Sequence, residues 1–240
     1  MNTVRSALCT VSFYVWSIFM GLVMIPMLLT PRPVFRWFVL LWSEGNFFIF
    51  RVIVGIRVEV RGRECIPAGP AIIASKHQSE WETLIFLRLL SDPVYIMKKE
   101  LGYIPGYGQF ARKMKMIFID RAGYAKSLRK LVKDAQKSIA TGRVLVIFPE
   151  GTRVEPGKKL PYRAGIAALY SALDLPVTPV VHNSGLCWPK QSFRKYAGTI
   201  VIRFLEPINP GLERREFMTQ LEVVMENAAD ELMAEANPAY

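Results

Sequence analysis

The chain has 240 residues, which is enough for one substantial domain with an appendage and short for two full domains. Hydrophobic residues make up 51% of the chain and the mean hydropathy is +0.21, and both values are high for a soluble domain, so part of the chain is expected to contact lipid. The formal net charge of +11 argues against a cationic partner and favours an anionic one, such as a nucleic acid, a membrane surface or a phosphorylated substrate.

The N-terminal part of the chain contains two long apolar segments. No charged residue occurs between Arg5 and Arg32, and residues 7–30 exceed the ~20 apolar residues that a helix needs to cross a bilayer. Residues 34–56 mix aromatic rings with a few charges, which is typical of the membrane interface. No small-residue cleavage site follows the first segment, which argues against a cleaved signal peptide. We therefore predict that residues 1–56 form a helical membrane anchor.

Two topologies are compatible with these segments. In one, the first segment spans the bilayer, with Arg5 outside and the basic remainder inside. In the other, which is preferred, the two segments form a hairpin that enters one leaflet and returns, with Pro26 at a kink and residues 30–33 as a rigid connector. Both topologies place the body of the protein on the cytoplasmic face.

From about residue 57 the pattern changes to short apolar runs that alternate with amphipathic segments. The runs predicted to be strands are residues 58–60, 71–74, 94–97, 116–120, 143–148, 176–181 and 199–204. The predicted helices are residues 83–90, 124–140 and 161–173, followed by a final helix with Asn209 as N-cap and Pro210 in its first turn. We therefore predict an α/β domain over residues 57–240, in which a mixed central sheet is flanked by helices.

The stretch that follows the second predicted strand contains a histidine and the start of a helix. Ser79 and Glu82 have the spacing of a capping box, in which Glu82 reaches back to the main chain of Ser79. Alternatively, Glu82 points back along the helix, holds one ring nitrogen of His77 and leaves the other as a general base for a substrate hydroxyl. The residues by themselves do not choose between a cap and a catalytic pair.

Charged residues end several of the other predicted strands. Glu150-Gly151-Thr152-Arg153 follows residues 143–148, at the kind of strand end where open α/β sheets bind ligands, and Arg153 could hold a phosphate through paired donors. The alternative is an ordinary surface ion pair between Glu150 and Arg153. Asp120-Arg121 and Lys98 end two further strands, so cationic groups are expected at several strand ends.

Cysteine and histidine are scarce. Cys9, Cys65 and Cys187 lie far apart without zinc-type spacing, which predicts reduced thiols and a folded part that faces the cytosol. Histidine occurs only at positions 77 and 182, so a histidine-based mechanism has two candidates. His182 is interpreted as a loop residue near the site.

Together these residues resemble the motifs of the glycerophospholipid acyltransferase family, most closely the bacterial 1-acyl-sn-glycerol-3-phosphate (lysophosphatidic acid) acyltransferases. The resemblance covers nearly the whole chain, and the matching motifs occur in family order: His77-x4-Glu82, Lys98 of a Lys-x-Glu-Leu element, Phe118-Ile119-Asp120-Arg121, Glu150-Gly151-Thr152-Arg153 and a Pro-rich strand at residues 175–180. Two positions depart from the family pattern. The acid is most often Asp and is Glu82 here, with a side chain one methylene longer, and the Asn common before the histidine is Lys76.

The resemblance implies a membrane enzyme that transfers a fatty acyl group from acyl-CoA or acyl carrier protein directly to the 2-hydroxyl of lysophosphatidic acid, giving phosphatidic acid for phospholipid biosynthesis. His77 would be the general base and Glu82 would orient it. The implied substrate-binding residues are Lys98, Arg121, Glu150, Gly151, Thr152 and Arg153. No metal or other cofactor and no nucleic acid partner is expected, and no GxSxG sequence is present to supply an acyl-enzyme. The implied location is the inner (cytoplasmic) membrane, with the catalytic domain on the cytosolic face.

Other interpretations stay open. Within the same chemistry, the acceptor could be another lysolipid, such as a lyso-ornithine lipid. From a different class, the chain could be a non-catalytic, basic lipid-binding protein of the membrane surface. Arg112, Lys113 and Lys115 would attract anionic lipid in either case, or would simply add solubility.

Overall fold

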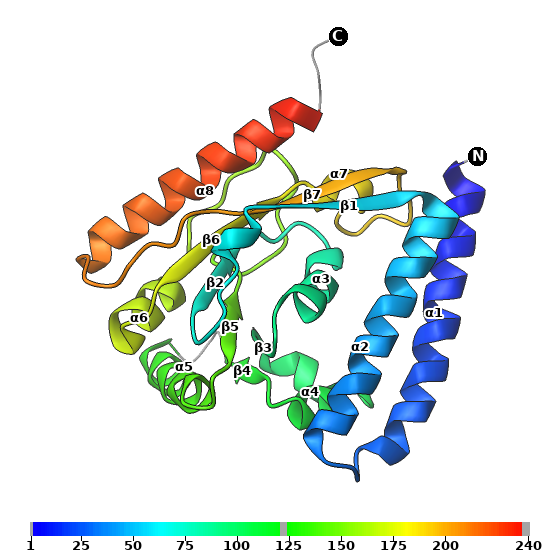
Figure 1. Cartoon of the computed structure of the whole chain (residues 1–240), viewed down its shortest axis with the longest axis horizontal. Coiled ribbons are helices and arrows are strands. Elements are labelled where there is room, and N and C mark those ends of the chain that lie inside the picture. The colour runs from blue at the N-terminus through cyan, green and yellow to red at the C-terminus, as the bar shows by residue number, and fades with distance from the viewer. Residues whose placement is uncertain (1, 121–123, 237–240) are drawn as a thin grey trace.

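The protein is described by a computed structural model that covers residues 2–120 and 124–236. Its centre is a sheet of seven strands in the order β1-β7-β6-β2-β5-β3-β4 (Figure 1). The strands are β1 (Ile56–Arg61), β2 (Ile72–Ser75), β3 (Pro93–Lys98), β4 (Ile117–Ile119), β5 (Val144–Ile147), β6 (Val177–His182) and β7 (Gly198–Phe204). Neighbouring strands are parallel except for the antiparallel pair β6 and β7, so the predicted α/β class with a mixed central sheet is confirmed.

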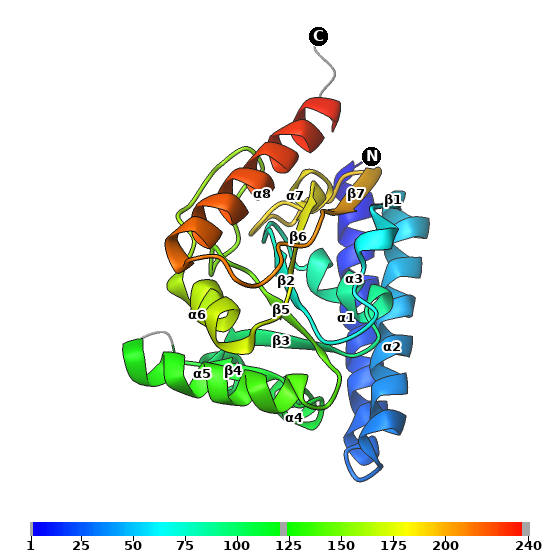
Figure 2. The same ribbon diagram turned by 60° about the vertical axis from the view of Figure 1, so that its left-hand side comes forward.

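Helices cover both faces of the sheet (Figures 1 and 2). One face carries α1 (Asn2–Met27), α2 (Arg32–Ile49) and α3 (Trp81–Leu89), and the other carries α5 (Tyr124–Ile139), α6 (Ala164–Leu173) and α8 (Arg214–Ala236). Shorter turns of helix connect these elements: the π-helix η1 (Phe50–Val54), the 3-10 helices η2 (Arg63–Cys65) and η3 (Lys99–Tyr103), α4 (Tyr107–Lys113) and α7 (Ser184–Cys187).

Strand β5 is apolar in every position because helices cover both faces of the sheet around it. Ile73 and Val146 face the cluster that contains Trp81 of α3, whereas Ile72 and Leu145 face the cluster under α5, α6 and α8. Each of these side chains is fully buried, and such burial stabilises a fold by about 1.5–3 kcal/mol per large aliphatic side chain. Helices on both faces therefore explain why the sequence of β5 shows a continuous apolar run and no alternation.

The final helix begins later than the sequence predicted. Ile208 pairs with Val177 as an isolated bridge beside β6, so the chain is still extended there and turns only at residues 209–213. Gly211 has a φ of +113°, a conformation that favours glycine, and α8 begins at Arg214. The prediction that Asn209 caps this helix and Pro210 lies in its first turn is wrong. The reason is the long-range strand pairing, which local propensities do not report.

Helices α1 and α2 form an antiparallel pair along one side of the molecule (Figure 1), and polar contacts hold both ends of the pair to the body. Near the start of α1, the Ser6 hydroxyl bonds to the main chain of Lys195. At the other end, Lys113 Nζ donates to the Leu28 carbonyl oxygen at 2.8 Å and Arg32 pairs with Asp92 at 2.6 Å. The helices therefore lie against the body along their length.

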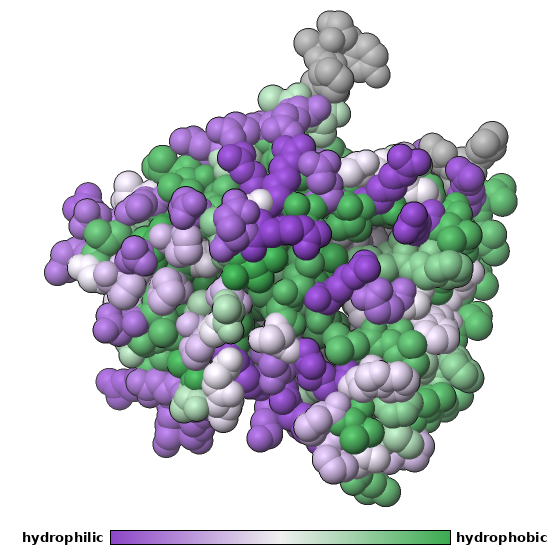
Figure 3. Space-filling model, in the orientation of Figure 1, coloured by the Kyte–Doolittle hydropathy of each residue, from purple (hydrophilic) through white to green (hydrophobic). Residues whose placement is uncertain are grey.

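The outer surface of this pair is apolar. Both helices are long and apolar enough to cross a membrane, and only 17% and 28% of their most apolar windows is buried in the protein. Val15, Ile18 and Leu22 of α1 are between 62% and 63% exposed, and Figure 3 shows hydrophobic side chains along this edge of the molecule. The division of the chain into an anchor, residues 1–56, and a domain, residues 57–240, stays a prediction.

Candidate active site

The predicted site residues follow the ends of neighbouring parallel strands. Strands β2, β5 and β3 are hydrogen-bonded in that order, so their carboxyl ends lie at one edge of the sheet. His77 follows β2, the Glu150–Arg153 segment follows β5, and Lys98 is the last residue of β3. This is the edge at which open α/β sheets bind ligands. Arg121 follows β4 and lies outside the described residues, so its role stays a prediction.

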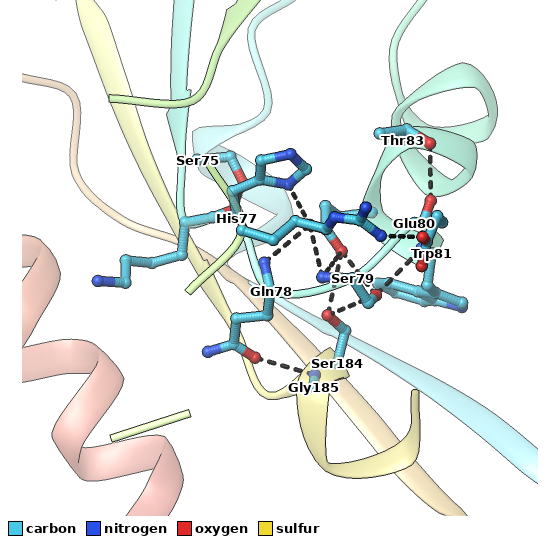
Figure 4. A network of polar contacts seen from close by, with 12 residues as sticks. Ser75, His77, Gln78, Ser79, Glu80, Trp81, Thr83, Ser184 and Gly185 are labelled. Carbon is cyan, nitrogen blue, oxygen red and sulfur yellow. Dashed lines mark hydrogen bonds and ion pairs between the residues drawn. The ribbon is translucent and has the colours of Figure 1, made fainter. Parts of the chain in front are cut away.

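Glu82 is the centre of a buried hydrogen-bond network. Its Oε1 accepts hydrogen bonds from His77 Nδ1 at 2.6 Å and from the N–H groups of Gln78 and Ser79 at 2.9 and 3.0 Å. Its Oε2 accepts from the hydroxyls of Ser79 and Ser184 at 2.8 and 3.1 Å. Figure 4 shows His77, Ser79 and Ser184 in this network, while the Gln78 side chain reaches the main chain of Gly185. Although Glu is one methylene longer than Asp, its carboxylate reaches the imidazole.

The charge of Glu82 fixes the tautomer of His77. Burial by itself raises the pKa of Glu82, but attraction to His182 and the hydrogen bond and charge of His77 outweigh it, and the pKa is about 2. The carboxylate is therefore ionised at neutral pH and accepts a hydrogen bond from the N–H at Nδ1, which leaves the lone pair on Nε2.

The low pKa of Glu82 also makes the stability of the fold depend on pH. Because this pKa lies below the ordinary 4.5, Glu82 stabilises the fold above pH 4.5, and the contribution is lost as the pH falls toward 2.

The second ring nitrogen of His77 is available for chemistry. Nε2 has no hydrogen-bond partner among the described residues, and the side chain is 20% exposed. The imidazole stacks on the Phe148 ring with 4.2 Å between centroids and 18° between planes, which restricts its rotation. A ring with one nitrogen held and the other open is what a general base requires.

The cap and the histidine contact predicted for Glu82 are both present. The Ser79 hydroxyl oxygen accepts a hydrogen bond from the Trp81 N–H at 3.0 Å, and the Glu82 carboxylate accepts from the Ser79 N–H, so the two side chains cap the start of α3. A carboxylate in the first turn is also stabilised by the helix dipole. Glu82 therefore stabilises the turn that carries His77 and orients the ring at the same time.

The loop after β5 holds the main chain of His77 on both sides. Glu150 Oε2 accepts from the His77 N–H at 2.8 Å, and the Val154 N–H donates to the His77 carbonyl oxygen at 2.6 Å. Glu150 is 1% exposed, and its Oε1 lies 2.6 Å from Nζ of the equally buried Lys76. These contacts are all with the protein itself, and the predicted contact of Glu150 with substrate stays a prediction.

Arg153 lies next to the His77 loop and pairs with Glu80, not with Glu150. The guanidinium and the Glu80 carboxylate form an ion pair that is 29% and 49% exposed. The alternative prediction of a surface pair between Glu150 and Arg153 is therefore wrong, because Glu150 faces inward to Lys76. Thr152 and Lys98 are exposed, and Gly151 has a φ of +68°, which favours glycine. Arg153 is thus a partly exposed cation, and the predicted substrate contacts of Arg153, Thr152, Gly151 and Lys98 stay predictions.

His182 is not the loop residue that the sequence predicted. It is the last residue of β6, it is 1% exposed, and its Nε2 lies 2.9 Å from the Lys76 carbonyl oxygen. Burial lowers the pKa of His182, although the charge of Glu82 opposes this shift. Because the ring has no access to solvent, it is not placed to act as the base.

Sequence reasoning missed two groups that contact the site. Ser184 donates to Glu82 although 102 positions separate the two residues, and Glu226 of α8 lies 2.7 Å from Lys76 across 150 positions. No local spacing could have indicated either contact, because strand order brings them together.

Among the described residues, no group of three or more His, Cys, Asp and Glu side chains is placed to hold a metal ion. The three cysteines are free thiols, and burial raises the pKa of Cys187 to about 11.

Comparisons with known proteins point to one family. The family model described as Acyltransferase matches residues 57–183. A 1-acyl-sn-glycerol-3-phosphate acyltransferase of Pseudomonas aeruginosa is 36% identical over 207 residues, which cover 86% of this chain and 80% of that protein. The alpha form from Mus musculus is 31% identical over 163 residues, or 66% of this chain and 57% of that protein.

A solved structure extends the likeness to the whole chain. The crystal structure of the 1-acyl-sn-glycerophosphate (LPA) acyltransferase PlsC from Thermotoga maritima matches with a TM-score of 0.78 at 26% sequence identity and covers 98% of both chains. The structural match thus covers both the N-terminal helical pair and the strand ends that carry His77 and Arg153, whereas the family model begins at residue 57.

Proposed function

Because the chain belongs to the acyltransferase family, we propose that it is a 1-acyl-sn-glycerol-3-phosphate O-acyltransferase, which moves a fatty acyl group from a thioester donor to the 2-hydroxyl of lysophosphatidic acid. The relatives named for this reaction support the proposal. The observation that carries it is the 2.6 Å contact between His77 Nδ1 and an ionised Glu82, which leaves Nε2 open.

The geometry supports direct transfer. His77 Nε2 takes the proton of the acceptor 2-hydroxyl while the hydroxyl oxygen attacks the carbonyl carbon of the thioester. Glu82 stabilises the imidazolium that forms on His77. The tetrahedral intermediate then collapses, the carbon–sulfur bond breaks, and the proton on Nε2 passes to the leaving thiolate. The products are phosphatidic acid and the free thiol of the donor, which is acyl-CoA or acyl carrier protein in this proposal.

The acceptor phosphate is assigned to the cations at the strand ends. Arg153 is the best supported, because it is partly exposed beside the His77 loop and its guanidinium can bind two phosphate oxygens. Lys98 and Arg121 complete the proposed phosphate site, and Gly151 and Thr152 shape the loop beside it. When phosphate binds, Arg153 exchanges Glu80 for the substrate.

The proposal is tested with the purified full-length protein in detergent micelles. Each member of a lysolipid panel, including lysophosphatidic acid and a lyso-ornithine lipid, is offered with acyl-CoA and separately with acyl carrier protein. We expect the highest kcat/KM with lysophosphatidic acid. Preference for a lysolipid without phosphate would reassign the acceptor. No transfer to any acceptor would favour the alternative of a non-catalytic lipid-binding protein.

Replacing Arg153 with alanine is expected to raise the KM for lysophosphatidic acid about 10- to 100-fold, because one charge-assisted contact to the phosphate, worth about 1.5–3 kcal/mol, is lost. The KM for the donor should stay within a factor of two to three. Initial rates measured against each substrate in turn separate the two constants. Arg163→Ala is the control, because Arg163 lies beyond the loop, just before α6. An unchanged acceptor KM would remove Arg153 from the phosphate site.

We also propose that the α1–α2 pair binds the membrane as a hairpin in one leaflet. The body contacts both ends of the pair, at Ser6 and at Leu28, so a spanning α1 would have to separate one end from its partner. The location that we propose, from the resemblance to the bacterial enzymes, is the inner membrane, with the catalytic domain in the cytosol. Arg112 and Lys113 donate to the carbonyl oxygens of Gly102 and Leu28, and Lys115 is exposed; their attraction to anionic lipid stays a prediction.

The joint substitution of Ile18→Glu and Leu22→Glu is expected to lower binding to neutral phosphatidylcholine vesicles by about 100-fold or more. Two apolar side chains that are 62% and 63% exposed in the protein would no longer enter the lipid, and each is worth about 1.5–3 kcal/mol. Co-flotation with the vesicles measures the bound fraction. Val223→Glu on α8 is the matched control, since Val223 is 52% exposed on the other face of the sheet. Equal binding by the double variant and the wild type would exclude this anchor.

A further inference from the structure

A buried group of charges lies directly behind the His77 loop. Lys76 is 3% exposed, and its Nζ lies 2.6 Å from Glu150 Oε1 and 2.7 Å from Glu226 Oε1. The Tyr162 hydroxyl donates to the same Glu226 oxygen at 2.8 Å. These four residues come from the loops after β2 and β5, the segment before α6, and α8, so the group joins elements that are far apart in the sequence.

The group is connected to the catalytic loop through the main chain. Glu150 uses one oxygen for Lys76 and the other for the His77 N–H at 2.8 Å. Lys76 precedes His77 in the chain, and its own carbonyl oxygen accepts from His182 at 2.9 Å. Any movement of Glu150 therefore moves the backbone that carries the imidazole.

The balance of charge makes Lys76 the critical member. One ammonium compensates two buried carboxylates, and the remaining contacts of Glu150 and Glu226 are the neutral donors His77 N–H and Tyr162 O–H. Without Lys76, two carboxylates would be buried near each other with no cation, and breaking such a pair from one side is costly. The pKa of Lys76 is raised even though burial lowers it, because Glu150 and Glu226 attract the charged form.

We propose that Lys76 is a positioning residue for the reaction: by holding Glu150 in place it sets the main chain of His77, and Glu226 of α8 is the counter-charge that fixes Lys76. This inference rests on the proposed function and adds a residue set to it. A displacement of about 1 Å in a catalytic group can cost about 100-fold in rate, so the effect should appear in kcat while substrate binding is retained.

The test is a double-substitution cycle in the full-length enzyme, with Lys76→Met, Glu226→Gln and both together. We expect Lys76→Met to lower kcat about 100-fold and the Tm by about 10 °C, with both KM values within threefold of wild type. Glu226→Gln alone should cost about threefold in kcat, because Lys76 and Glu150 remain a balanced pair. In the double variant, kcat and Tm should both rise above those of Lys76→Met, since one uncompensated carboxylate is gone.

The control uses an exposed ion pair that also ends on α8 but starts from the segment between β5 and α6. Lys159 and Asp230 lie 2.7 Å apart and are 52% and 54% exposed, so Lys159→Met should leave kcat within twofold and the Tm within about 2 °C. If Lys76→Met keeps kcat within threefold, or if the double variant is no better than Lys76→Met, the positioning role is overturned. If Lys76→Met does not fold, rescue of folding by the second substitution supports the charge balance and its absence rejects it.

The Tm measurements distinguish a failure of this inference from a failure of the proposed function. It is read on the folded protein without any substrate, so a protein that transfers no acyl chain still reports whether Glu226 and Lys76 are coupled. If the enzyme transfers no acyl chain but Lys76 and Glu226 are coupled in Tm, the proposed reaction is refuted. If transfer is normal but the two residues are not coupled, only the positioning role of Lys76 is refuted.

Discussion

Replacing His77 with alanine is expected to lower kcat for acyl transfer about 100- to 10,000-fold, the range that a positioned general base contributes. The imidazole is held at Nδ1 by Glu82 at 2.6 Å and is packed against Phe148, so the direction of the open Nε2 is fixed. Both KM values should change little, because the ring acts on the hydroxyl only as it loses its proton. Steady-state rates against lysophosphatidic acid measure the effect.

The contrasting variant is His182→Ala. His182 is fully buried and bonds to the Lys76 carbonyl oxygen, so its loss should lower the Tm by several degrees. Below that Tm the enzyme should keep most of its kcat. His77→Ala should show the opposite pattern, with a near-normal Tm and very low activity. If His77→Ala retained more than about a tenth of the wild-type rate, the base would have to be assigned elsewhere.

The substitution Glu82→Gln is expected to lower kcat about 100-fold or more. A neutral amide cannot stabilise the imidazolium, and its NH2 group can hold the ring in the tautomer that carries the proton on Nε2. The change also places an amide among the N–H groups of Gln78 and Ser79 and the hydroxyl of Ser184, so the Tm should fall as well. Assays well below the lowered Tm separate the two effects.

Ser184→Ala is the matched control for the structural part of this effect. It removes one donor from Glu82 and leaves the charge and the contact with His77 in place, so it should cost about 1 kcal/mol of stability and less than tenfold in kcat. Glu82→Asp should recover part of the lost rate by restoring the negative charge. If Glu82→Gln lowered the Tm while kcat stayed normal, Glu82 would be only a helix cap.

The strands were predictable to within about two residues because the central strands are buried on both faces. The predicted run 143–148 contains β5 (Val144–Ile147), and 116–120 contains β4 (Ile117–Ile119). Such runs report local burial, which is a property of consecutive residues. The predictions failed where a distant partner decided the backbone. Ile208 pairs with Val177, and the Arg163 N–H donates to the Pro149 carbonyl oxygen at 2.8 Å, so the helices predicted from residues 210 and 161 start later.

Within the site too, contacts between residues close in the sequence were predictable, and contacts between distant residues were not. The sequence alone determined that His77 and Glu82 could meet, because five positions across a helix start bring the two side chains together, and that cations follow several strands. Only the tertiary structure decided that Glu150 turns inward to Lys76, that Arg153 pairs with Glu80, and that Glu226 of α8 closes the buried charge group. A chain segment carries its own periodicity and turns, whereas the order of strands in the sheet chooses which distant side chains share one buried space.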